Sequence, residues 1–155
     1  MTTNLFDLSG RTALITGGGT GLGKHFATVL SEGGASVVLC ARRVDKLQQT
    51  ADEINESGGK AICVPMDITD SAQVSAGFDA AKEFGDVSVL INNAGTVAEP
   101  SLLELDEAEW DQVLDTNLKG AWLVAREAAR RMIDAELPGT VINIASILGS
   151  AVQKG

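Results

Sequence analysis

The sequence predicts an α/β fold in which one parallel sheet carries helices on both faces. Short apolar runs rich in β-branched residues alternate with amphipathic segments along most of the chain. The apolar runs lack the polar–apolar alternation of strands that face water on one side, as expected for strands that are buried on both faces. A glycine-rich turn separates the first apolar run from the first amphipathic segment. Together these observations favour right-handed strand–helix–strand units.

The glycine-rich turn lies within residues 11–26, RTALITGGGTGLGKHF, where an apolar run stops at Thr16 and five glycines follow. We expect a strand, a tight turn and a helix. Glycine adopts positive φ without strain, and its missing Cβ lets the backbone approach a bound phosphate. The helix that follows presents free N–H groups and the positive end of its dipole, so an anion is the natural ligand.

The glycine spacing leaves two interpretations open. Gly17, Gly21 and Gly23 form GxxxGxG, which is not the commoner dinucleotide spacing GxGxxG. Residues 18–24 match the GxxxxGK of a P-loop, but His25 stands where a Ser or Thr hydroxyl would bind Mg²⁺. Nucleotide hydrolysis at a degenerate P-loop is therefore one hypothesis.

The composition limits the class of protein. A chain of 155 residues with 45% hydrophobic content fits one domain with a core. The net charge of −9 argues against a general nucleic-acid or anionic-membrane partner, because both need a basic surface. The first ten residues lack a basic start and a continuous apolar stretch, and no apolar run reaches the roughly 18 residues of a membrane span. We expect a cytoplasmic protein.

Metal and disulfide chemistry are not expected. Cys40 and Cys63 each lie in an apolar, strand-like run, which favours reduced core thiols. The single histidine leaves no zinc-binding set, so we predict no metal site.

Two further units follow the first helix. Strands are predicted at 36–41, 60–66 and 87–93, with helices at about 44–57 and 71–84. Asp70 is the predicted N-cap of the second of these helices, and Gly85 its end. The expected buried positions are Val44, Leu47, Ala51, Ile54, Val74, Phe78 and Ala81.

A long helix is predicted from Asp106 to about Ala135, followed by a fifth strand at 140–146. Asn117 interrupts its apolar face, and we expect a buried amide that bonds a neighbouring loop. The helical apolar repeat comprises Trp110, Val113, Leu114, Leu118, Ala121, Val124, Ala128 and Met132.

The chain resembles the classical short-chain dehydrogenases/reductases. The matching positions are TGGGTGLG at 16–23, Asp67, NNAG at 92–95, Asn117 and Ser146, and they span nearly the whole sequence. The resemblance implies a Rossmann-type doubly wound parallel sheet with strand order 3-2-1-4-5, lacking the later strands and helices of the full family fold. Residues 1–155 would then be a single dinucleotide-binding domain. A P-loop enzyme would instead need an acidic residue after a later strand, where this chain has asparagines.

The resemblance also implies roles for individual residues. Asn117 would hold a water in a proton relay, and Ser146 would hydrogen-bond a substrate carbonyl. Asp67 would contact adenine, with Ile68 flanking the ring, whereas Asn92 would stabilise the central strand. The implied cofactor-binding residues are Thr16, Gly17, Gly19, Thr20, Gly21, Leu22, Gly23, Arg42, Arg43, Asp67, Ile68, Asn93, Ala94 and Gly95.

The end of the second predicted strand indicates which dinucleotide would bind. An acidic residue there bonds the ribose 2′-OH of NAD, whereas an arginine accommodates the 2′-phosphate of NADP. Ala41 stands at the acidic position, and Arg42 and Arg43 follow it. NADP(H) is the predicted cofactor, with NAD(H) as the alternative.

The family's catalytic YxxxK motif is missing, because the sequence contains no tyrosine. We therefore expect the cofactor-binding half of a longer NADP(H)-dependent reductase that interconverts a carbonyl and an alcohol, inactive by itself. The alternative is a non-catalytic module that binds a dinucleotide or a protein. The family resemblance further implies a homo-oligomer, dimer or tetramer, formed through the helix at 106–135.

Overall fold

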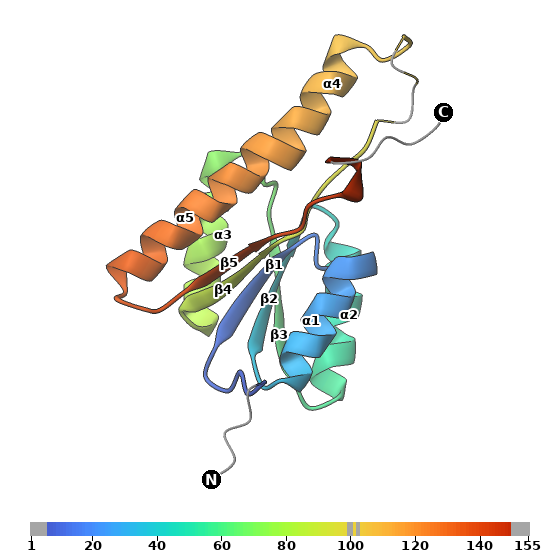
Figure 1. Ribbon diagram of the computed structural model, residues 1–155. Coiled ribbons are helices and arrows are strands. Elements are labelled where there is room, and N and C mark those ends of the chain that lie inside the picture. The colour runs from blue at the N-terminus through green and yellow to red at the C-terminus, as the bar shows by residue number, and fades with distance from the viewer. Residues whose placement is uncertain (1–5, 99–100, 102, 150–155) are drawn as a thin grey trace.

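A five-stranded parallel sheet of order β3-β2-β1-β4-β5 forms the centre of the computed structural model, which describes residues 6–98, 101 and 103–149 (Figure 1). The predicted order is confirmed. The strands are β1 (Thr12–Thr16), β2 (Ser36–Ala41), β3 (Lys60–Pro65), β4 (Val87–Asn92) and β5 (Thr140–Asn143). The fifth strand is shorter than predicted, since it ends at Asn143 and leaves Ser146 in the loop beyond it.

The helices are α1 (Gly21–Glu32), α2 (Val44–Glu56), α3 (Ser71–Phe84), α4 (Glu107–Leu114) and α5 (Ala121–Asp134). The π-helical segment η1 (Asp115–Gly120) joins α4 to α5, and the short 3₁₀ turn η2 (Ile147–Gly149) follows β5. Asp70 caps α3 as predicted, because its carboxylate accepts hydrogen bonds from the backbone N–H groups of Ala72 and Gln73. Gly85 follows the last residue of α3.

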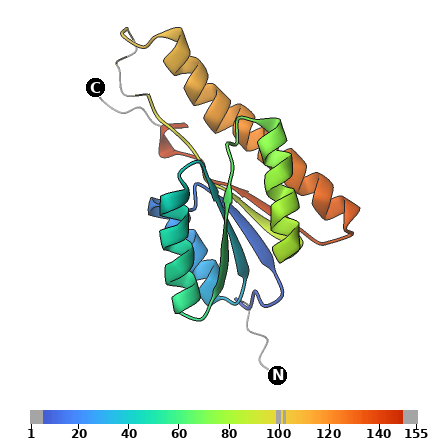
Figure 2. The same ribbon diagram turned by 180° about the vertical axis from the view of Figure 1, so that it is seen from behind.

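Two apolar layers enclose the sheet. Helices α1 and α2 cover one face, where Ile15, Val37 and Leu47 are fully buried. Helices α3 and α5 cover the other, where Leu14, Phe78 and Val124 are buried (Figures 1 and 2). Burial of both faces explains why the inner strands are apolar at nearly every position.

The long helix differs from its prediction in two ways. It is interrupted by η1 at Asn117, and its first half projects past the sheet (Figure 1). Only the α5 part of the predicted stripe is buried, at Val124, Ala128 and Met132. Trp110, Leu114 and Leu118 are exposed because no strand lies beneath them. The N-terminal residue of the α2 stripe, Val44, is also exposed.

Candidate cofactor and active site

A cleft of about 550 Å³ opens at the carboxyl ends of the strands. It lies at β1, where the strand order reverses: β2 and β3 lie on one side of β1, and β4 and β5 lie on the other. Open α/β sheets bind ligands at this point. All the predicted cofactor-binding residues except Thr16 and Gly19 line the cleft.

The glycine turn brings an open helix end to the cleft. Gly17 and Gly21 have φ of +69° and +53°, a region that favours glycine. Helix α1 begins at Gly21, and the side chain of its N-cap residue Thr20 makes no capping hydrogen bond. The first N–H groups of α1 therefore remain available to an anion in the cleft.

The side chain of Asn93 holds the glycine turn by hydrogen bonds. Its Nδ2 donates to the carbonyl oxygen of Thr16 at 3.0 Å and reaches that of Gly17 at 3.5 Å. A Cβ at Gly23 would collide with the Gly17 carbonyl and with this amide nitrogen. Close packing, rather than an unusual φ, thus requires glycine at position 23.

Thr16 joins β1 to the loop after β4. Its buried hydroxyl oxygen accepts the backbone N–H groups of Asn93 and Ala94, both at 3.0 Å. The hydroxyl donates to Oδ1 of Asn92 at 3.5 Å. The Asn92 amide in turn donates to the carbonyl of Ala121 and to Oδ1 of Asn143, so Asn92 ties the central strand to α5 and β5.

Two exposed arginines lie at the rim beyond β2. Arg42 and Arg43 line the cleft, and Ala41 ends the strand. Helix α2 begins at Val44, and its N-cap residue Arg43 makes no side-chain capping bond. The two guanidinium groups and the open end of α2 give this rim a positive character.

Asp67 follows β3, the strand that neighbours β2 in the sheet. Its Oδ1 accepts hydrogen bonds from the N–H and hydroxyl of Thr69 at 2.9 and 2.8 Å. Asp67 therefore caps the turn that follows β3. Its Oδ2 has no protein partner within the described part of the chain, and Asp67 and Ile68 both line the cleft.

The two predicted active-site residues share a second cavity, of about 810 Å³, which adjoins the first at Leu22, Asn93, Ala94 and Gly95. Asn117 and Ser146 both line it. The Oγ of Ser146 accepts the N–H of Leu148 at 3.1 Å, and its hydroxyl hydrogen has no acceptor among the described residues.

Asn117 is exposed rather than buried as predicted, but its amide does bond a loop. Its Oδ1 accepts the N–H of Thr96 and its Nδ2 donates to the Thr96 carbonyl, both at 2.8 Å. The side chain therefore holds the loop after β4 through two hydrogen bonds. Asn117 lies in η1, and π-helical turns of this kind are frequent at functional sites.

Four residues line the cleft without being among the predicted cofactor-binding residues, namely Cys40, Ala41, Met66 and Thr116. Thr116 directly precedes Asn117, and Met66 directly precedes Asp67. Their position next to a predicted site residue is the one sequence signal that could have identified them. Thr16 and Gly19 do not line the cleft. Thr16 is buried beneath it, and Gly19 packs against Lys46 and Leu47 at the start of α2.

The position of Lys24 argues against the P-loop hypothesis. A P-loop lysine reaches the phosphates over the glycine turn. The Nζ of Lys24 instead forms an ion pair with Glu53 of α2. Among the described residues, no group of three His, Cys, Asp or Glu side chains is arranged to hold a metal ion.

The two cysteines belong to opposite faces of the sheet. Cys40 is buried with the α3–α5 layer, whereas Cys63 packs against the α1–α2 layer. Both are free thiols, and burial raises the pKa of each. The predicted reduced state is consistent with this geometry.

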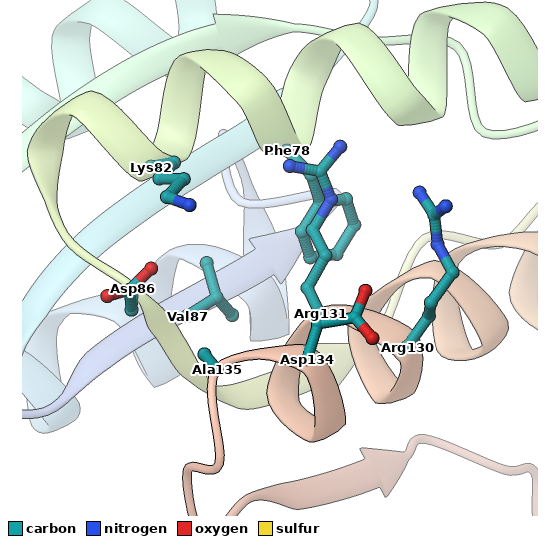
Figure 3. Close-up of a pocket in the computed structure, with 8 residues that line it drawn as sticks. All are labelled: Phe78, Lys82, Asp86, Val87, Arg130, Arg131, Asp134 and Ala135. Carbon is teal, nitrogen blue, oxygen red and sulfur yellow. The ribbon is translucent and has the colours of Figure 1, made fainter.

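A further cavity, of about 280 Å³, lies between α3 and α5 (Figure 3). Phe78 and Val87 line it together with Lys82 and Arg131. The Arg131 guanidinium is already bonded to Asp79, Glu127 and the carbonyl of Ser75. Among the described residues, this cavity and the cleft at the carboxyl ends of the strands have no lining residue in common.

Within the described ranges, no helix is both long enough and apolar enough to cross a bilayer.

Comparisons with known proteins agree with the geometry. Residues 11–155 match the family model of the short chain dehydrogenases. An uncharacterized oxidoreductase of Staphylococcus aureus (strain USA300) is 36% identical over 148 residues, covering 95% of this chain and 63% of the relative. An uncharacterized oxidoreductase of Caenorhabditis elegans is 42% identical over 144 residues, covering 90% and 46%.

A solved structure, a short-chain type dehydrogenase/reductase from Mycobacterium marinum, superposes with a TM-score of 0.93 at 43% identity. The match covers 96% of this chain and 61% of that one. The chain thus spans less than two thirds of the length of each relative described here. The family match, the strand order and the glycine turn agree, and the chain belongs to the short-chain dehydrogenase family.

Proposed function

We propose that this chain carries the NADP(H)-binding part of an oxidoreductase that interconverts a carbonyl and an alcohol. The observation that carries the cofactor assignment is the rim after β2, where Ala41 is followed by Arg42 and Arg43. A carboxylate at that rim would serve a free ribose 2′-OH, whereas guanidinium groups serve a 2′-phosphate.

The remaining residues have distinct proposed roles. The open N-terminus of α1 holds the pyrophosphate, Asp67 and Ile68 hold the adenine, and Asn93 to Gly95 line the ribose and nicotinamide region. A bound nicotinamide supplies or accepts the hydride. The Ser146 hydroxyl donates to the substrate oxygen, and Asn117 holds the loop beside it.

One proton donor is missing from this set. The sequence contains no tyrosine, and Ser146 cannot by itself act as an acid near neutral pH. We propose that a part of the protein outside this sequence supplies the acid, and that this part also completes the substrate pocket. Small-molecule substrates, a homo-oligomeric state and a cytoplasmic location belong to the same proposal.

Replacing Arg42 by Asp tests the cofactor assignment. The unchanged protein should bind NADP⁺ more tightly than NAD⁺, and Arg42→Asp should weaken NADP⁺ by about 10- to 100-fold, the worth of one charged hydrogen bond. Titration calorimetry with both cofactors measures this. Lys82→Asp is the control, since it changes the charge equally on α3, outside the cofactor cleft. Equal affinity of the unchanged protein for both cofactors would contradict NADP selectivity.

Residues 1–155 expressed alone should bind the cofactor weakly and show no turnover. Loss of a positioned general acid costs roughly 10²- to 10⁴-fold in rate even in an otherwise complete site. NADPH consumption against a panel of aldehydes and ketones measures the activity. Substantial turnover would show that the acid lies within this sequence, whereas cofactor binding by a full-length protein without any turnover would favour a non-catalytic module.

A further inference from the structure

Helix α3 begins with an incomplete capping box. In a complete box the side chain at the third helical position accepts the N–H of the N-cap residue. Helix α4 follows this rule, since Glu109 accepts the N–H of Asp106 and Asp106 accepts that of Glu109. At α3 the equivalent pair is Asp70 and Gln73, but the Asp70 N–H donates to the Asp67 carbonyl.

The side chain of Gln73 is redirected to the loop before the helix. Its Oε1 accepts the backbone N–H of Asp67 at 3.0 Å, and its Nε2 donates to Oδ2 of Asp70 at 3.0 Å. Gln73 thereby connects the N-cap of α3 to the residue at the end of β3.

This contact leaves Asp67 with a single unused polar atom. Its N–H is held by Gln73, its carbonyl by Asp70, and its Oδ1 by both groups of Thr69. The remaining atom, Oδ2, has no partner among the described residues, and Asp67 lines the cofactor cleft. A carboxylate oxygen fixed in this way accepts one hydrogen bond from a ligand.

We propose that Gln73 is a positioning residue for base recognition, which fixes Asp67 so that its Oδ2 selects a base with an exocyclic amino group. This inference rests on the proposed function. Adenine presents an N–H donor at its 6 position, whereas hypoxanthine presents a carbonyl oxygen there, which a carboxylate repels. Gln73 is exposed and does not itself line the cleft, so it acts only through Asp67.

The test compares two ligands that differ only at the base. Titration calorimetry gives the dissociation constants of NADP⁺ and of nicotinamide hypoxanthine dinucleotide phosphate for each variant. Gln73→Met keeps the length of the side chain but removes the acceptor, and Gln73→Ala removes it at an exposed helical position that tolerates alanine. Gln73→Glu retains an oxygen acceptor for the Asp67 N–H but replaces the donor to Asp70 with a carboxylate oxygen, so only partial recovery is expected. Gln48→Met is the matched control, because Gln48 is an exposed helical glutamine whose amide donates to Asp52 on the same helix.

The unchanged protein and the control should prefer NADP⁺ over the hypoxanthine analogue. Gln73→Met and Gln73→Ala should each lower this preference by roughly three- to tenfold, the effect of one hydrogen bond. Gln73→Glu should recover at least part of it. A loss of stability alone would weaken both ligands equally and leave the ratio unchanged.

The outcomes separate the two proposals. An unchanged ratio in Gln73→Met or Gln73→Ala, with NADP⁺ still bound, would overturn the role of Gln73 and leave the proposed function standing. Failure of the unchanged protein to bind either dinucleotide would overturn the proposed function itself, and this inference with it.

Discussion

Gly21 and Gly23 lie two residues apart in one turn, yet each requires glycine for a different reason. Gly21 has a φ of +53°, but a Cβ there would meet no atom within 4 Å. At Gly23 no positive φ is involved, and a Cβ would collide with the Gly17 carbonyl and the Asn93 amide. The first constraint is a backbone preference, and the second is a contact between segments distant in sequence.

Alanine substitutions should separate these constraints. Gly21→Ala should cost about 1 kcal/mol of folding free energy, the typical cost of left-handed backbone in a residue with a Cβ. Gly23→Ala should cost more, roughly 2–4 kcal/mol, because overpacking must push the turn away from Asn93. Urea unfolding of both variants measures the difference. A Gly23→Ala variant as stable as Gly21→Ala would show that the turn can relax.

At the scale of elements, Arg131 fastens α5 to α3. Its guanidinium bonds Asp79 at 2.8 Å and the Ser75 carbonyl at 3.1 Å, and it lies over the Phe78 ring. Glu127, one turn earlier on α5, accepts from Arg131 and from Arg130, both at 2.7 Å. Burial raises the pKa of Glu127, but the bonds from the two arginines outweigh it, so the net pKa lies below the ordinary value.

Glu127→Gln should therefore change the response of the protein to acid. Because the pKa of Glu127 is lower in the folded chain, its stabilisation is present above the unfolded pKa and is lost as the pH falls through the folded pKa. The variant should be less stable at pH 7 by about 1 kcal/mol, and the difference should shrink as the pH falls below the ordinary glutamate pKa of roughly 4.3.

Urea unfolding across this pH range measures the effect. Glu83→Gln, on the exposed face of α3, is the control. Its free energy of unfolding should stay close to that of the unchanged protein throughout. A difference between the Glu127 variant and the unchanged protein that stays constant at every pH at which the protein folds would show that charge at Glu127 is not the cause.

At the scale of the whole molecule, apolar side chains remain exposed along α4, η1 and α5. Leu118, Trp122 and Ile133 are 67%, 55% and 75% exposed. All four residues of β5 are exposed as well. Exposed apolar area of this kind marks a surface that another segment or another chain covers.

We predict that the protein self-associates through the long helix formed by α4, η1 and α5. Leu118→Glu should shift it toward the monomer, because burying an unpaired carboxylate in an apolar contact costs several kcal/mol, on the order of 3 or more. Light scattering at micromolar concentration measures the state. Leu103→Glu is the control, since Leu103 is 95% exposed and lies outside these helices. A monomeric unchanged protein would refute the prediction.

The sequence by itself determined the features that depend on neighbouring residues. The glycine turn, the N-cap Asp70, the buried positions of α3 and the first four strands follow from spacing over a few residues, and the structure confirms them. The family resemblance supplied the strand order, which no local pattern contains, and the sheet confirms that order too.

Only the tertiary structure decided what distant residues do to one another. Asn93 supports a turn 76 residues earlier in the chain, and Lys24 faces Glu53 rather than the glycine turn. Gln73 accepts the N–H of Asp67 instead of that of its N-cap residue Asp70. Periodicity also predicted burial at Trp110 and Leu118, which are exposed. An apolar repeat identifies the face of a helix that would be buried. Whether that face is buried within this chain depends on how far the sheet extends beneath the helix.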